Sequence, residues 1–366
     1  MKLLTDKDTH SKIKLNVLKN IIPYVFAVII ALVVGGGLIA MAGADPLLGY
    51  WALISGGFGG IRELTESLVK MTPLLTAGLG ILIAFKCGFF NIGAEGQLYM
   101  GALFATFVGI NLDSPLALPA SFLAGLLGGG MWGVIPAILK VKRGVNEVIS
   151  TVILNYIAIW IVHYMIHWPL RDPEIPNPQS YYVTPWAQLP RLLPGTRFHI
   201  GVIIAVLLAF LVYYFLSNTT LGYEIKATGF SPLAARYGSV NVSRTTVFAM
   251  LLSGGLAGIG GMIEVAGTHR YLMDDISPGY GYMAILVTLI ANLHPLATII
   301  SGFFVGGLFT GAASMQRSLG VPLAFANVVV GVIVVFIIAK DTFIRYMLIP
   351  VKYIMKSQKE EGNENR

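Results

Sequence analysis

The chain has 366 residues; 55% of them are hydrophobic and only 12% are charged, and the mean hydropathy is +0.74. Because a soluble domain carries about 25% charged residues, this composition excludes an ordinary soluble protein and predicts an all-α, polytopic membrane protein. The formal net charge of +7 would suit a nucleic-acid partner, but the basic residues are distributed as in a membrane protein, and we expect no nucleic acid to bind.

Ten apolar runs follow one another along the chain, and several reach the roughly 20 residues that cross a bilayer. An even number of crossings places both termini on one side, and most of the 25 basic residues then lie in segments on that side. Since cytoplasmic segments carry the excess of Lys and Arg, we expect about ten transmembrane helices in a bacterial cell membrane, with cytoplasmic N- and C-termini. The runs are 21–42, 72–90, 91–111, 116–139, 147–168, 200–217, 246–266, 281–293, 295–313 and 323–339.

The polar segments outside these runs are short, so we expect no separate soluble domain. A basic cytoplasmic segment covers residues 1–20, a single transmembrane domain covers 21–345, and a charged cytoplasmic tail covers 346–366. The longest loops are an outer, proline-rich loop at 169–199, expected to be an ordered but irregular cap, and an inner loop at 218–245.

Three apolar stretches are too short to cross about 30 Å of hydrocarbon at about 1.5 Å per residue. They are 72–85, 98–110 and 281–293, and residues 61–71 before the first of them predict a separate amphipathic helix on the outer interface. Broken or short helices survive at membrane depth where protein or a wet cavity surrounds them. We therefore expect these segments to lie near the pathway of a transporter.

The polar stretch GFFNIGAEGQ, residues 88–97, lies between two of the apolar stretches and contains the strongest candidate, Glu95. An ionisable residue near mid-membrane is expensive and marks a functional site by default. Asn91 and Glu95 are four residues apart, so on a helix both would point the same way, while the glycines are expected to break the helix. The alternative is that this cluster caps a helix or makes interhelical hydrogen bonds. The residues expected to line a substrate pathway are Asn91, Glu95, Gln97, Asn155 and Asn292.

Other features of the spans have structural interpretations. Asn146 and Glu147 are expected to begin a helix, where a carboxylate favours the positive end of the helix dipole. His163 is interpreted as a packing histidine and Glu264 as an interfacial residue. Small residues crowd three spans, and close helix–helix contacts are expected there. These small-residue runs are 125–133, 253–261 and 302–314.

The chain carries no catalytic motif. No Gly-Lys pair occurs in the sequence, hence no phosphate-binding loop of the G-x-x-x-x-G-K-[ST] type. We find neither a cluster of His, Cys and Asp at metal-ligand spacing nor a G-x-S-x-G nucleophile elbow. We expect no catalytic residue, no metal and no cofactor on this chain.

The inner loop contains a short predicted helix. Ser231 before Pro232 is a strong helix start, because the hydroxyl caps free amides and proline suits the first turn. Gly238 ends the helix. A helix this short is marginal in water on its own, so we expect it to dock into another protein chain.

These residues carry a resemblance to a known family. The pattern L-G-Y-E-I-K-A-T-G-F-S-P-x-A-A-x-Y-G (221–238) resembles the coupling loop of permease subunits of ABC importers for branched-chain amino acids, simple sugars and nucleosides. The stretches 88–97 and 146–158 resemble the nucleoside branch, and the likeness covers about residues 20–345. The two aspartates within 267–282 depart from it. The resemblance assigns contact with the ATPase to Gly222, Ser231, Pro232, Ala234, Ala235, Arg236 and Gly238.

The resemblance implies a complex embedded in the lipid bilayer. Its other members would be a paralogous second permease subunit, two ATPase subunits or one duplicated ATPase chain, and an extracellular substrate-binding lipoprotein. ATP would bind the ATPase and move the 231–238 helix, so that the membrane spans alternate their access. This chain would import a small molecule, a nucleoside by resemblance, without being an enzyme.

Other functions stay open. Within the family, the substrate could be a simple sugar or a branched-chain amino acid. From another class, Glu95 could serve a proton-coupled secondary transporter. A passive channel is disfavoured, because the sequence offers no repeated ring of charged residues.

Overall fold

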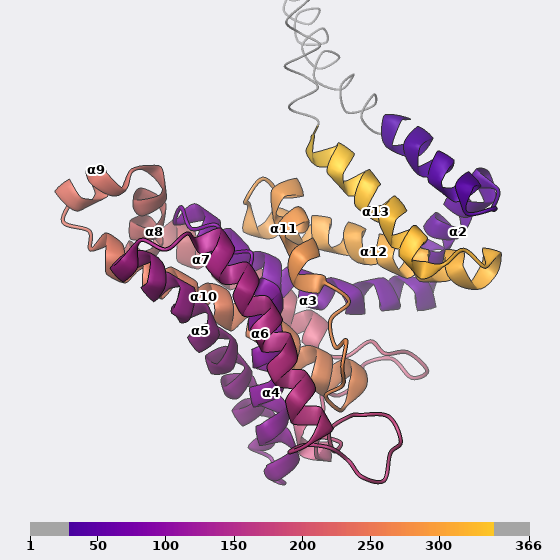
Figure 1. Ribbon diagram of the computed structural model, residues 1–366, viewed down its shortest axis with the longest axis horizontal. Coiled ribbons are helices and arrows are strands. Elements are labelled where there is room, and N and C mark those ends of the chain that lie inside the picture. Colours follow the sequence, from indigo (N-terminus) through magenta and orange to yellow (C-terminus); the bar gives the residue numbers. More distant parts are fainter. Residues whose placement is uncertain (1–28, 340–366) are drawn as a thin grey trace, which may run out of the picture. The chain divides into compact units, whose positions relative to one another are not determined.

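The computed structural model describes residues 29–339, and in this part helices are the only extended regular elements (Figure 1). The predicted all-α class is therefore confirmed. Two compact units make up the chain, residues 1–52 with 312–366 and residues 53–311, and each is described by itself. The predicted segments 1–20 and 346–366 lie outside the described residues, and the single domain over 21–345 stays a prediction.

The unit 53–311 contains most of the helices. In the other unit, the helix Ile29–Met41 is bent by 109° from α2 (Pro46–Phe58), and α13 (Leu323–Ile338) follows α12. Both α2 and α12 (Pro295–Leu319) have residues in each unit. The remaining helices are α3 (Ile61–Lys86), α4 (Ala94–Asn111), α5 (Ala117–Arg143), α6 (Glu147–His167), the 3₁₀ turn η1 (Pro185–Ala187), α7 (Gly201–Asn218), α8 (Thr220–Phe230), α9 (Pro232–Tyr237), α10 (Val242–Ile263), the π-helical turn η2 (Glu264–His269) and α11 (Tyr280–Ile290).

Six helices between residues 29 and 339 are long and apolar enough to cross a membrane, or seven if the bent pair Ile29–Met41 and Pro46–Phe58 forms one span. They confirm a multi-pass membrane protein. Helices α11 and α13 are apolar but shorter. The expected total of about ten spans and the cytoplasmic termini stay predictions.

The separate amphipathic helix at 61–71 was a wrong prediction. Residues 61–71 are the first turns of α3, which continues to Lys86 over 26 residues, a length of about 39 Å. The polar side chains of these turns find partners in the protein: Lys70 donates to the carbonyl of Phe309, and Glu66 pairs with Arg197. The stretch 72–85 is consequently part of a full-length span. Of the three stretches expected to be short, 281–293 gives the shortest helix, the 11-residue α11.

Close contacts between glycines hold α5 against α10, as the small-residue runs predicted. A Cβ atom on Gly129 would lie 2.3 Å from the carbonyl oxygen of Gly254 and 2.7 Å from the Cα of Gly258. Similarly, a Cβ on Gly101 of α4 would lie 2.2 Å from the Cα of Gly258. In lipid, helices gain little from hydrophobic association and depend on such close packing. Glycine is needed here because the backbones themselves are in contact.

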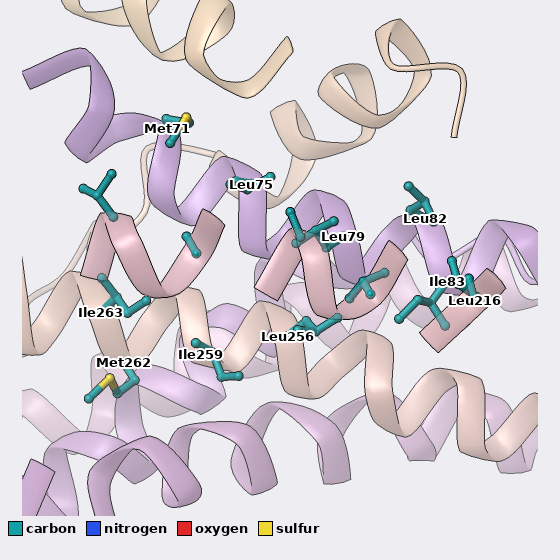
Figure 2. Packing of buried hydrophobic residues seen from close by; sticks show 14 of the residues in the cluster. Met71, Leu75, Leu79, Leu82, Ile83, Leu216, Leu256, Ile259, Met262 and Ile263 are labelled. Atoms are coloured by element: carbon teal, nitrogen blue, oxygen red, sulfur yellow. The ribbon is translucent and has the colours of Figure 1, made fainter. Parts of the chain in front are cut away.

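A large apolar cluster of this unit lies where α3, α7 and α10 meet (Figure 2). Leu75 and Leu79 of α3 and Ile259 of α10 are buried almost completely. Each such side chain makes many weak dispersion contacts, which add up to a large total. The cluster fixes the helices around which the polar site is built.

The two long loops lie at opposite ends of α10 (Figure 1). Helices α8 and α9 precede its first residue, Val242. The loop 169–199 packs at the other end, where the amide of Leu189 donates to the carbonyl of Ala266 and that of Val183 to Arg270. Apart from η1, this loop has only isolated bridges within its described residues, among them Arg171 with Ser180, in agreement with the expected irregular cap.

The glycine contacts give a test of the fold. Replacing Gly129 by alanine should destabilise the protein by about 2–3 kcal/mol, because the new methyl group meets backbone atoms that cannot rotate away. The matched control is Gly331→Ala, since a Cβ there has no neighbour within 4 Å. Thermal unfolding in detergent, followed by size-exclusion chromatography, measures both. Equal midpoints for the two variants would contradict this packing.

Candidate functional site

The predicted break in the GFFNIGAEGQ stretch is present between α3 and α4. Helix α3 ends at Lys86 and α4 begins at Ala94. Gly88 adopts a φ of +75°, a left-handed conformation that glycine accepts without strain. Asn91 lies in the non-helical connection rather than on α4. The prediction that Asn91 and Glu95 share one helical face was therefore wrong.

Asn91 joins the connection to α4 and α10. Its side-chain amide donates to Oε1 of Gln97 at 2.9 Å and to the hydroxyl of Ser253 at 2.9 Å. Its side-chain oxygen, Oδ1, accepts from the backbone amide of Gly93. Ser253 is halfway along α10, so these polar groups lie deep within the helix bundle. A buried polar group without such partners would cost about 1–3 kcal/mol.

Asn155 of α6 performs the same task on the other side of the connection. Its Oδ1 accepts from the amide of Gly96 at 2.8 Å, one of the α4 amides that lack a partner within the helix. Its Nδ2 donates to the carbonyl of Ile92 at 2.9 Å and to the hydroxyl of Tyr282 at 3.2 Å. This single side chain consequently connects α4, α6 and α11.

Glu95 caps α11 from a distance in the sequence. The first turn of α11 has no side-chain cap from its own N-cap residue, Gly279. Instead, Oε2 of Glu95 accepts from the amide of Gly281 at 2.6 Å. A Cβ on Gly281 would lie 2.2 Å from the amide nitrogen of Glu95, so only glycine allows this approach. A carboxylate at a helix N-terminus is favoured by the unpaired amides and the dipole there.

Four of the five predicted pathway residues belong to this network. Asn91, Glu95, Gln97 and Asn155 are at most 2% exposed, and their partners are protein groups. The arrangement corresponds to the alternative of helix capping and interhelical hydrogen bonding. Asn292 lies apart, exposed in the turn after α11 with a φ of +49°.

The accessible groups beside the network are aromatic. Tyr282, which receives the hydrogen bond from Asn155, is partly exposed. Along the outer face of α6 there is a groove of about 490 Å³. Its lining is almost wholly apolar and consists of Ile153, Tyr156, Ile157, Trp160, Ile161 and Tyr164.

The predicted helix of the inner loop is confirmed as α9. Ser231 is its N-cap, with the hydroxyl accepting from the amide of Ala234, and Pro232 occupies the first turn. Gly238 is the C-cap. Of the remaining candidates, Arg236 is exposed and Ala235 is buried. Gly222 lies on α8, where a Cβ would come within 2.3 Å of the carbonyl of Phe215.

Helix α9 leaves its apolar side chains uncovered. Leu233 and Tyr237 of α9 are 66% and 86% exposed, and Phe230, the last residue of α8, is 92% exposed beside them. A six-residue helix with three such side chains around it fits the expectation that this segment docks into a partner chain.

The structure corrects one further interpretation and adds residues that the sequence did not indicate. Asn146 caps α6 as predicted. Glu264, expected at the interface, is only 2% exposed. His163 packs against Trp160, as expected, and its partly exposed ring also pairs with Asp274. The missed members of the network, Ser253, Tyr282 and Gly281, are far from 88–97 in the sequence and carry no signal of their own.

Comparison with known proteins gives a family match over most of the chain. The family described as "Branched-chain amino acid transport system / permease component" matches residues 64–338. No solved structure matches the chain.

Several curated proteins are similar over nearly their whole length. The glucose ABC transporter permease protein TsgB13 of Haloferax volcanii is 34% identical, with 88% of each chain covered. The guanosine ABC transporter permease protein NupP of Bacillus subtilis is 32% identical over 90% of this chain and 96% of its own. The nucleoside ABC transporter permease protein NupB of Lactococcus lactis is 28% identical over 94% of this chain and 98% of its own.

The cap on α11 gives a test of the network. Glu95→Leu should destabilise the protein by about 2–3 kcal/mol, because the amide of Gly281 loses its acceptor inside the protein. Glu95→Gln keeps an acceptor oxygen in the same place and should stay close to the wild type. Thermal unfolding in detergent compares the three proteins. The capping role is wrong if leucine and glutamine behave alike.

Proposed function

The chain belongs to the family of branched-chain amino acid transport permeases and is a multi-pass membrane protein of an ABC transporter, and we propose that it imports nucleosides. The proposal of a nucleoside substrate rests on the similarity to the guanosine and nucleoside permeases, over 96% and 98% of their lengths. The stretches 88–97 and 146–158, which resemble the nucleoside branch, contribute the core of the buried network. Glucose is the second candidate, since the glucose permease has the higher identity, 34%.

In the proposed complex, ATP hydrolysis takes place on two ATPase subunits or on one duplicated ATPase chain. Helix α9 and the end of α8 supply the contact, with the uncovered side chains of Phe230, Leu233 and Tyr237 inserted into the ATPase. Ala235 faces the body of the permease and holds the helix in place. Gly222 and Gly238 act through the backbone, at the approach of α8 to α7 and at the end of α9.

The proposed path of the substrate runs beside the network, between this chain and a paralogous second permease subunit. Tyr282 and the aromatic residues of the α6 groove face outward, where a second subunit would enclose them. Aromatic rings offer a flat apolar surface for a nucleobase, and the Tyr282 hydroxyl offers a hydrogen bond. Asn91, Glu95, Gln97 and Asn155 hold the connecting backbone and reach the path only when the helices shift. An extracellular lipoprotein would deliver the substrate to the side of the loop 169–199.

Uptake by the assembled transporter tests the substrate. Cells that lack their own nucleoside uptake and express all subunits should accumulate labelled guanosine or uridine. Excess unlabelled nucleoside should abolish this signal, whereas glucose, ribose and leucine should leave it unchanged. Uptake of labelled glucose that nucleosides do not inhibit would replace the first candidate by the second.

The same assay examines the path. Tyr282→Ala should raise the substrate concentration needed for half-maximal uptake. Tyr282→Phe keeps the aromatic ring and should therefore stay closer to the wild type. Tyr214→Ala is the control, because Tyr214 is 63% exposed on α7, away from the network. Equal uptake by all three variants and the wild type would remove Tyr282 from the path.

The coupling role of α9 is tested by a single charge. Leu233→Asp should release the ATPase subunit during purification and stop uptake, because a carboxylate cannot be buried unpaired in the contact. Leu192→Asp, at an exposed leucine of the loop 169–199, should retain the ATPase. Binding of the ATPase is measured by co-purification from membranes. Full retention by Leu233→Asp would exclude this face of α9.

A further inference from the structure

Two histidines and an aspartate meet at the C-terminal end of α6. His163 and His167 are four residues apart on this helix, and Asp274 comes from the segment between η2 and α11. One ligand atom from each residue lies within 4.8 Å of the others. The i, i+4 spacing of the histidines is visible in the sequence, but the third member of the group is more than a hundred residues away.

The distances within this group suit a small metal ion. Nδ1 of His163 is 2.9 Å from Oδ1 of Asp274, and Nε2 of His167 is 3.8 Å from Oδ2 of the same carboxylate. Ligands at about 2.0–2.2 Å from a tetrahedral zinc ion lie about 3.3–3.6 Å from one another. The two observed separations lie on either side of this range, and a metal ion would take the place of the direct hydrogen bond between His163 and Asp274.

The surroundings orient the ligands. Nδ1 of His167 is 2.8 Å from the carbonyl oxygen of His163. Because a carbonyl oxygen can only accept, Nδ1 carries the proton in this hydrogen bond. The lone pair is then on Nε2, the nitrogen nearer Asp274. Such hydrogen bonds from the second ring nitrogen are usual for metal-binding histidines. The ring of Trp160 packs edge-on against His163.

The segment that carries Asp274 is also held in place. The amide of Leu272 donates to the hydroxyl of Ser180, and the amide of Ser180 donates to the carbonyl of Leu272. A bridge joins Gln179 to Met273, directly before Asp274. The carboxylate is consequently presented by an anchored backbone rather than by a free loop.

We propose that His163, His167 and Asp274 bind a divalent transition-metal ion, for which zinc is the best fit. Two imidazoles and one carboxylate are typical protein ligands of zinc, and a water molecule would complete the tetrahedron. The side chains of His163 and Asp274 are each 41% exposed, so the ion and its water have access from solvent. Oxygen-preferring ions such as Mg²⁺ are poorly suited to two nitrogen ligands.

The metal ion joins α6 to the segment that leads into α11. That segment continues through Ser277, whose hydroxyl accepts from the amide of Tyr280, to the turn that Glu95 caps. A bound ion would therefore restrain the segment that enters α11, in addition to the contact that Glu95 makes with the first turn. This role is independent of which substrate the transporter carries.

Direct binding of zinc to the purified full-length chain tests the proposal. The protein is purified in detergent with an affinity tag that contains no histidine, stripped with a chelator, and dialysed against Zn²⁺ at neutral pH. Elemental analysis should find about one tightly held zinc ion per chain. His167→Ala and Asp274→Ala should each weaken its binding by about tenfold or more.

Matched variants separate a site from unspecific binding and from misfolding. Asp275→Ala, at the neighbouring exposed aspartate, and His294→Ala, at an exposed histidine elsewhere, should bind zinc like the wild type. His167→Cys supplies another zinc ligand and should retain binding that His167→Ala loses. Cys87→Ser checks the buried thiol. No zinc on the wild-type chain, or equal zinc on all variants, would overturn the proposal.

Discussion

The backbone between α3 and α4 leaves the helix deep inside the bundle, and every polar group there must find its partner within the protein. Lipid offers none, and non-helical backbone at membrane depth is tolerated only where protein or water surrounds it. The side chains of Asn91, Gln97 and Asn155 supply the partners, with Ser253 of α10 as the anchor on the far side. The arrangement of α4, α6, α10 and α11 around this point depends on that requirement.

The glycines make the network possible by allowing the helices to approach. Helix α5 contacts α10 through Gly129 and Gly254 with no side chain between the backbones. Gly281 lies against the amide of Glu95 in the same way, and this contact places the first turn of α11 on the carboxylate. A larger residue at Gly281 would separate the amide of that residue from the Glu95 carboxylate, and one at Gly129 or Gly254 would push α5 and α10 apart. The hydrogen bonds of the network therefore depend on the close packing of the helices.

The break also has a neighbour on the side of α9. A Cβ on Gly229, near the end of α8, would lie 2.1 Å from the carbonyl of Lys86, and one on Gly88 would lie 3.3 Å from the Cα of Gly229. The end of α8 thus rests directly on the end of α3 and the start of the connection. In the proposed mechanism, a displacement of α9 would pass through these contacts to the polar network, because closely packed backbones cannot absorb it by changing rotamers.

Local sequence signals determined much of this protein. Composition predicted a helical membrane protein, Ser231, Pro232 and Gly238 delimited α9, Asn146 began α6, and the glycine runs indicated the tight helix contacts, because each of these depends on neighbouring residues alone. Only the tertiary structure decided that residues 61–71 extend α3, that Glu95 caps α11, and that His163 and His167 meet Asp274. In each case a polar side chain finds its partner far away in the sequence, Glu66 with Arg197, Glu95 with Gly281 and His163 with Asp274. Such partners are decided by the packing of the helices and not by neighbouring residues.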